Sequence, residues 1–150
     1  MSSEEYRYLV RVAGTDLDGS KKLAYALTGI KGVGIRLAES IIRVVGLDPN
    51  IRMGFISDQD VRKIEEVLAN PVKYGIPKWM VNRQKDISSG EYLHLTGSDL
   101  TLAIKTDIDD MRKMKSYRGI RHALGLKVRG QHTKTTGRKG QTVGVRRKKK

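Results

Sequence analysis

The sequence contains no cysteine and has few aromatic residues. Among its 150 residues there are six Tyr, one Phe and one Trp. The absence of cysteine excludes a disulfide-stapled secreted scaffold, a cysteine-based zinc finger and a thiol nucleophile. With so few large aromatic side chains, a hydrophobic core has to be built from Leu, Ile and Val.

Long apolar runs are also missing. No segment approaches the roughly 20 apolar residues that a membrane-spanning helix requires. The first residues, "MSSEEYRYLVRVAG", place two acidic residues near the start and lack the apolar stretch of a signal peptide. We therefore expect a soluble, intracellular protein without a membrane partner, with room for one modest domain plus an appendage.

Acidic residues are absent from the C-terminal part of the chain. Of the 30 Lys and Arg residues, 15 follow residue 110, whereas all 16 Asp and Glu residues precede residue 111. This division predicts a near-neutral folded body that carries a polyanion-binding arm. A basic tail kept only for solubility or nuclear targeting is the alternative, but it would need neither the regular glycines nor the interleaved Tyr, Leu, Val and His.

Apolar periodicity predicts a mainly α fold, with a small helical body in residues 1–115 and an extended basic arm in residues 116–150. Within the body we expect a short strand in 6–12, a helix-hairpin-helix (helix-two-turns-helix) module in 21–45, a helix starting after Ser57, a β-hairpin excursion in 72–97 and a long helix in 99–115. The glycines beyond Tyr117 are expected to end regular structure. The arm has too few large apolar residues to offset the entropy of ordering, so alone it should be disordered.

The segment "LAYALTGIKGVGIRLAESII" places a glycine hairpin between two amphipathic helices. Gly32 and Gly34 would permit positive φ angles and the close approach of a phosphate. Backbone N–H groups of the hairpin, of Val33 and of the second helix would point at the anion, and Lys31 and Arg36 would add charge. Such contacts read the nucleic-acid backbone and not the bases. An ordinary glycine turn between packed helices is the plainer alternative.

The arm interleaves cations with glycine and hydroxyl side chains. Arginine can fork onto phosphate oxygens, and Thr, Gln and His can meet phosphates, 2′-hydroxyls or unpaired bases. The candidate RNA-binding residues are Arg118, Gly119, Arg121, His122, Lys127, Arg129, Gly130, Gln131, His132, Thr133, Lys134, Arg138 and Lys139.

Catalytic and cofactor signatures are missing. "GIKGVG" is not a dinucleotide-binding fingerprint, and "GLKVRGQH" lacks the lysine and hydroxyl of a P-loop. The three histidines, His94, His122 and His132, are scattered, so we expect no metal and no cofactor. We also expect no catalytic residues. A carboxylate pair among Asp107, Asp109 and Asp110 is a weak second interpretation of an exposed helix face.

Two alternatives to RNA binding remain. A DNA repair glycosylase or nuclease could use the helix-hairpin-helix for docking, with Asp48 or Asp58 as its carboxylate, although neither has a companion motif. A DNA-binding or DNA-compacting protein is the other. Cleavage of damaged duplex would indicate the first, and equal affinity for duplex DNA and folded RNA would indicate the second.

The order of these motifs resembles one family nearly end to end. "RVAGTDLDGSKKLAYALTGIKGVG", followed much later by "YRGIRHALGLKVRGQHTKTTGRKG", is similar to the universal small-ribosomal-subunit protein thirteen family. "GQHTKTTGR" and the "PKWMVNRQKD" excursion resemble its archaeal and eukaryotic form. The eukaryotic counterpart is called small-subunit protein eighteen.

The resemblance implies a non-catalytic constituent of the cytoplasmic ribosome, bound to ribosomal RNA in the head of the small subunit. It implies small-subunit protein nineteen as a neighbour, and a bridge to large-subunit RNA and large-subunit protein five. It further implies that the tail approaches transfer RNA in the peptidyl site. The candidates for that approach are Arg146, Arg147, Lys148, Lys149 and Lys150.

Overall fold

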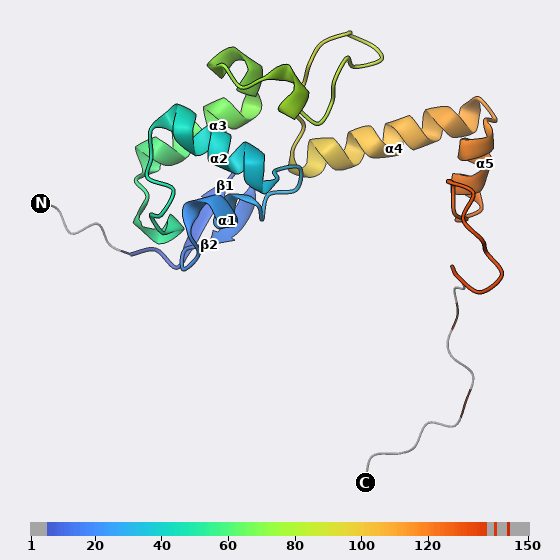
Figure 1. The fold of residues 1–150 in the computed structure, drawn as a ribbon, viewed down its shortest axis with the longest axis horizontal. Coiled ribbons are helices and arrows are strands. Elements are labelled where there is room, and N and C mark those ends of the chain that lie inside the picture. The colour runs from blue at the N-terminus through green and yellow to red at the C-terminus, as the bar shows by residue number, and fades with distance from the viewer. Residues whose placement is uncertain (1–5, 138–139, 141–143, 145–150) are drawn as a thin grey trace, which may run out of the picture. The chain divides into compact units, whose positions relative to one another are not determined.

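The computed structural model describes residues 6–137 together with Gly140 and Gly144. The chain divides into two compact units on either side of the Ala103–Ile104 junction (Figure 1). Within the described residues, no helix is both long and apolar enough to cross a membrane.

The described chain is mainly helical, as predicted. Two strands come first, followed by five α-helices and three short 3-10 helices among the described residues. The elements are β1 Leu9–Val12, β2 Thr15–Asp18, α1 Leu23–Leu27, α2 Ile35–Val45, η1 Met53–Phe55, α3 Asp58–Ala69, η2 Pro71–Tyr74, η3 Lys78–Met80, α4 Gly97–Lys113 and α5 Tyr117–Ala123.

β1 and β2 form an antiparallel hairpin in which Val10 pairs with Leu17. Ala13 and Gly14 connect the strands, both with positive φ, which matches the twist that a two-residue hairpin turn requires. The second strand was not predicted, because "GTDLDGS" looks like a turn: only Leu17 of β2 is apolar and buried.

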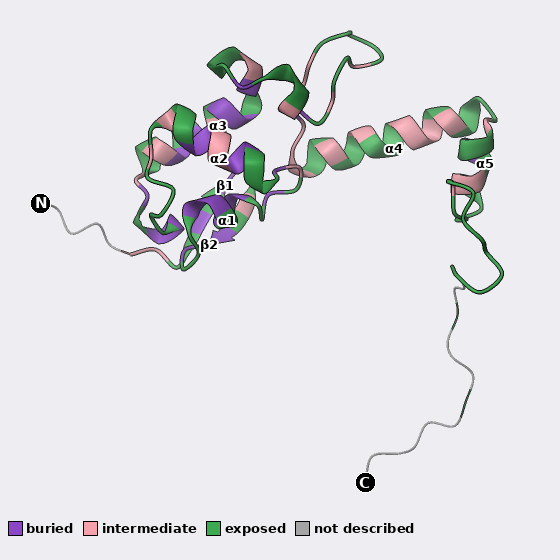
Figure 2. Cartoon of the chain, viewed as in Figure 1, coloured by how far each residue is buried: buried purple, intermediate pink, exposed green. Residues whose placement is uncertain are grey.

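The core lies between this hairpin and α1, α2 and α3. Its fully buried side chains come from all four, and Figure 2 shows the buried residues in purple on these elements. Most apolar positions predicted for α2 and α3 are buried, and Val45 of α2 is only partly buried. The buried ones are Leu37, Ala38, Ile41 and Ile42 in α2, and Val61, Ile64, Val67 and Leu68 in α3. The helical spacing of these residues therefore located the core correctly.

The helix ends follow local sequence signals in part. Ser57 caps α3 by accepting a hydrogen bond from the Asp60 N–H, and Gly46 ends α2 with φ of 80°. Ser20 donates its hydroxyl to the Asp18 carboxylate, and α1 starts at Leu23 with no side-chain cap.

The excursion predicted in residues 72–97 contains two 3-10 helices and one isolated antiparallel bridge, between Arg83 and Leu93. It has no described strand. A turn stabilised by Asp86 closes the loop, because this carboxylate accepts hydrogen bonds from Ser88, Ser89 and Arg83. These bonds hold the pKa of Asp86 well below its usual range, led by the bond from Ser88.

The predicted end of regular structure at Tyr117 is wrong, because α5 follows that point. Ser116 caps it by accepting from the Gly119 N–H and donates its own hydroxyl to the Met111 carbonyl of α4. Gly119 is buried at this corner, and a Cβ atom there would overlap the backbone of Met111. Glycine here permits close helix packing and is not a break in the helix. After α5, residues 124–137 contain no helix or strand, as predicted.

Candidate nucleic-acid interface

The helix-hairpin-helix predicted in 21–45 is present, with α1 and α2 joined by residues 28–34. Gly34 is the residue that precedes α2, and no side chain of the described chain caps that end. The first N–H groups of a helix have no partner within the helix, so the start of α2 offers donors to an anion.

The two hairpin glycines have different roles. Gly32 has φ of +103°, and a Cβ atom there would lie 2.7 Å from the Leu95 carbonyl oxygen. Gly34 has φ of −95°, so it does not use the positive φ that glycine permits, and no atom lies within 4 Å of an added Cβ. Gly32 is therefore needed for packing against the chain at Leu95, whereas Gly34 leaves space beside the start of α2.

The other residues predicted at this site also differ in their burial and contacts. The Val33 side chain is buried in the core, which leaves only its backbone for an outside ligand. The Lys31 ammonium donates to the Thr101 hydroxyl at 2.8 Å. Arg36 is 85% exposed and pairs with Glu39 at 3.2 Å, an exposed pair of the kind that contributes little to stability.

Sequence reasoning missed Trp79 and Asn82 at this site. They line a cavity of about 440 Å³ together with Gly32, Gly34, Ile35, Arg36, Leu37, Met80 and His94. Asn82 donates to the Leu95 carbonyl and accepts from the Leu95 N–H, which holds that segment against Gly32. The segment "PKWMVNRQKD" has no apolar periodicity. The feature that could have indicated a binding site is its single Trp, which is 73% exposed.

In the second unit, three predicted residues come together. Arg118 and His122 of α5 and Arg129 of the following segment line a cavity of about 620 Å³ with Met111 and Val128. Within the described chain, neither arginine makes a hydrogen bond or ion pair. Two cations beside apolar side chains suit a phosphate-bearing ligand with an apolar face.

Acidic side chains at the end of α4 do not neutralise this cluster. Asp109 pairs with Arg112 and Asp110 with Lys113, both at 3.2 Å. Each carboxylate pairs with a cation three residues later on its own helix, which is common on exposed helix faces. These contacts support an exposed helix face and not a catalytic carboxylate pair.

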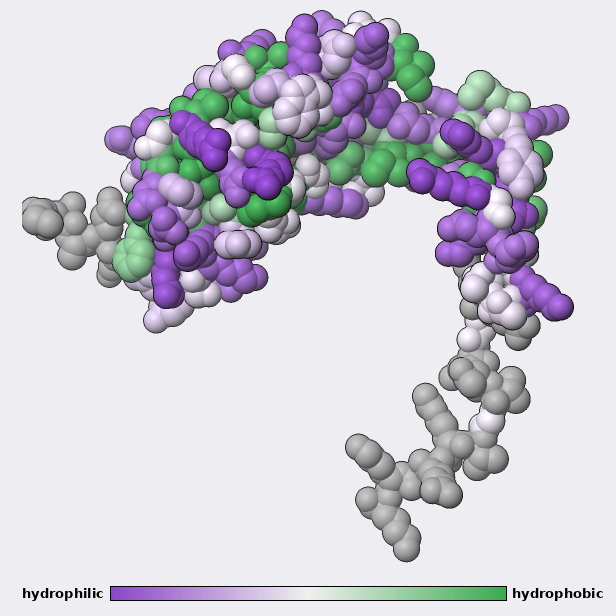
Figure 3. Space-filling view, in the orientation of Figure 1, coloured by the Kyte–Doolittle hydropathy of each residue, from purple (hydrophilic) through white to green (hydrophobic). Residues whose placement is uncertain are grey.

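The remaining arm residues are exposed or support the backbone. Arg121 donates its Nε hydrogen to the Lys127 carbonyl at 2.9 Å, so it shapes the segment after α5. The residues Lys127, Gly130, Gln131, His132, Thr133 and Lys134 are exposed, and Figure 3 shows mainly hydrophilic side chains along this part. The candidates Arg138, Lys139, Arg146, Arg147, Lys148, Lys149 and Lys150 lie outside the described residues.

Comparison with known proteins gives one consistent result. A family model described as "Ribosomal protein S13/S18" matches residues 11–139. Proteins named small ribosomal subunit protein uS13 are similar over nearly their whole length. The one from Staphylothermus marinus is 55% identical over 149 residues, covering 99% of each chain, and that from Methanocaldococcus jannaschii is 53% identical over 150 residues, covering all of both.

A further uS13, from Hyperthermus butylicus, is 53% identical over 150 residues and covers 100% of this chain and 99% of its own. Identity of this level over the full length shows common descent, and the resemblance inferred from the motifs is confirmed. The chain belongs to the ribosomal protein S13/S18 family.

Proposed function

We propose that the protein is a structural, non-catalytic constituent of the small ribosomal subunit that binds small-subunit ribosomal RNA. The observation that carries the proposal is the cluster of Arg118, His122 and Arg129, whose arginines have no acidic partner in the described chain. Family membership and the family's printed name support the same function. RNA phosphates would supply the missing counter-charge.

The helix-hairpin-helix would supply a second contact. The uncapped start of α2 and the open space at Gly34 suit the approach of one phosphate, with Arg36 beside it. Both contacts bind the sugar-phosphate backbone, so they would position the protein on folded RNA without reading its sequence. In this proposal the helical body of residues 1–115 docks, and the arm of residues 116–150 threads among RNA helices.

The finer placement rests on the family resemblance alone. We infer a position in the head of the subunit, next to small-subunit protein nineteen, with a bridge to large-subunit protein five and large-subunit RNA. The last residues, Arg146 to Lys150, would approach peptidyl-site transfer RNA. The protein would then be cytoplasmic, in the ribosome.

Sedimentation at low and high salt tests the proposal. At low salt the protein should travel with the small subunit, and rising salt should release it because counterion release drives phosphate binding. A protein that stays at the top of the gradient at low salt would contradict the proposal.

A further inference from the structure

A third cavity, of about 440 Å³, lies between the end of α3 and the excursion, and it shares His94 with the cavity at Gly32 and Gly34. It is lined by Ala69, Asn70, Pro71, Val72, Lys73, Lys78, Glu91, Tyr92, Leu93 and His94. Small-molecule sites usually measure roughly 300–1,000 Å³ and combine apolar walls with a few polar groups, and this lining has both. The proposed function does not use this cavity.

His94 is the buried polar group of the cavity. The side chain is 8% exposed, and its Nδ1 accepts a hydrogen bond from the Asn82 N–H. Since Nδ1 accepts, Nε2 carries the ring hydrogen, and Nε2 is buried with no hydrogen-bond partner in the described chain. Buried donors normally have an acceptor, and a ligand or a water in the cavity could supply one. Burial lowers the pKa of His94, which favours the neutral donor form.

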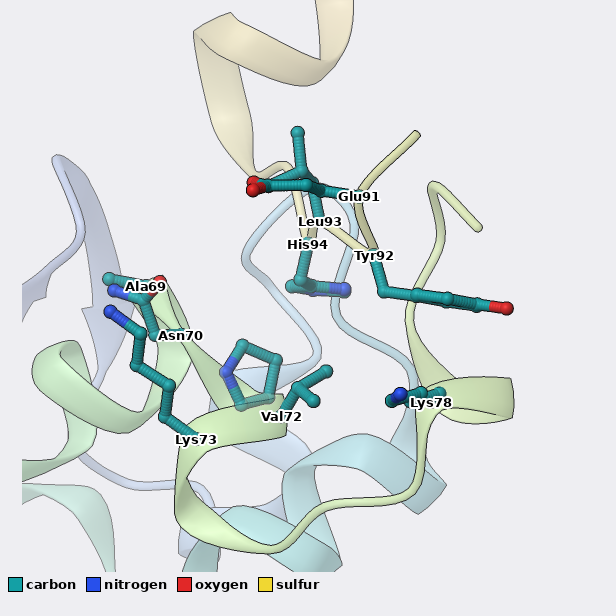
Figure 4. A pocket seen from close by; sticks show the side chains of 10 residues that line it. Ala69, Asn70, Val72, Lys73, Lys78, Glu91, Tyr92, Leu93 and His94 are labelled. Atoms are coloured by element: carbon teal, nitrogen blue, oxygen red, sulfur yellow. The ribbon is translucent and has the colours of Figure 1, made fainter. Parts of the chain in front are cut away.

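An aromatic ring and a cation face the same space. The Lys78 ammonium lies 5.2 Å from the centre of the Tyr92 ring, and Figure 4 shows His94 between them and Asn70 on the lining. A tyrosine at the edge of a cavity offers a stacking surface for a base, and lysines beside it attract phosphate. Lys73 supplies a second cation on the lining.

We infer that this cavity binds one unpaired nucleotide of an RNA. The base would stack on Tyr92 and accept a hydrogen bond from His94 Nε2, while Lys73 and Lys78 would meet the flanking phosphates. The inference rests on the proposed function, since it takes RNA as the partner. The Glu91 carboxylate on the lining could accept a hydrogen bond from the amino group of a base.

The test compares two RNA duplexes that differ only by one bulged 5-iodouridine. The unsubstituted protein should prefer the bulged duplex, and irradiation should crosslink the bulge to Tyr92. Tyr92→Ala should lower affinity for the bulged duplex by about five- to tenfold and leave affinity for the paired duplex unchanged. Tyr74→Ala is the matched control, since Tyr74 is 44% exposed and lies outside the lining.

Variants of Lys78 and His94 test the proposed contacts with the phosphate and with the base. Lys78→Ala should lower the preference for the bulge, whereas Lys105→Ala, with the same loss of charge outside the cavity, should not. His94→Leu should abolish the preference and His94→Gln should keep part of it, because glutamine can still donate. Since His94→Leu can also unfold the chain, the decision rests on Tyr92→Ala, which changes a side chain that is only partly buried.

The outcomes separate the two claims. If Tyr92→Ala has no effect, or weakens both duplexes equally, while Arg129→Ala weakens both, the cavity inference is wrong and the proposed function stands. If the unsubstituted protein binds neither duplex, the cavity inference is wrong, and sedimentation with the small subunit decides the proposed function. Binding of a glutamate-rich peptide that Tyr92→Ala weakens and Tyr74→Ala does not would overturn the nucleotide assignment in favour of an acidic protein partner.

Discussion

Gly119 of α5 lies directly against the carbonyl of Met111 in α4, where even a single added carbon would overlap the backbone. The contact joins the last turn of α4 to the short helix that presents Arg118 and His122. The arrangement of the cations in the second unit therefore depends on a residue that carries no charge.

Gly119→Ala should separate α5 from the end of α4. Forcing a side chain into a filled space typically costs about 1–3 kcal/mol. Here that cost should lower the local stability of the contact between α4 and α5. Hydrogen exchange of the α5 amides should become faster, with little change in α1 to α3. Gly34→Ala, which has open space around it, is the matched control, and equal exchange in both variants would contradict the role of Gly119.

Alanine at the two hairpin glycines should give opposite results. Gly32→Ala combines φ of +103° with a contact of 2.7 Å to Leu95, so it should lower the melting temperature clearly. Gly34→Ala should change stability by less than about 1 kcal/mol, the usual scale of a cap substitution, but weaken RNA binding. Thermal unfolding and RNA titration of both variants measure this. Unchanged RNA affinity in Gly34→Ala would show that the hairpin is only a turn.

Arg129→Ala should reduce the salt dependence of RNA binding without unfolding the chain. Losing one phosphate contact makes the slope of log K against log salt shallower by about 0.7–0.9. Arg121→Ala is a less clean probe, because Arg121 also donates to the Lys127 carbonyl. RNA titrations at several salt concentrations measure this slope. If the slope is the same for Arg129→Ala and the unsubstituted protein, Arg129 does not contact a phosphate.

Buried His94 should make the stability of the first unit depend on pH. Its pKa lies below the usual 6.5 in the folded chain, so the unfolded chain binds the proton more readily. The free energy of unfolding should therefore fall as pH drops below about 6.5, until the lowered pKa of the folded state is passed. Melting temperatures of the unsubstituted protein and His94→Gln across this range measure it. A pH dependence that persists unchanged in His94→Gln would assign it to another group.

The parts that sequence predicted correctly are those controlled by local patterning. The helical spacing in α2 and α3 identified the core, and Ser57 marked the start of α3. The charge division and the glycine motifs carried the family resemblance, which the comparisons confirm.

The wrong predictions share a physical cause. The role of a glycine, and the burial of an apolar helix face, depend on contacts with other parts of the folded chain. Gly119 looked like a helix breaker, but it serves close packing on Met111. The stripe of Leu100, Ile104, Ile108 and Met111 has helical spacing, yet no residue of α4 is buried among those described. No local pattern indicates that Asn82 would hold Leu95 against Gly32, because that contact joins distant segments.

The most direct test of the central claim is the salt dependence of binding to purified small-subunit ribosomal RNA. If about half of the 15 cations after residue 110 meet phosphates, the slope of log K against log salt should lie between about −5 and −7. A slope near zero, or tight binding that high salt does not weaken, would contradict the account.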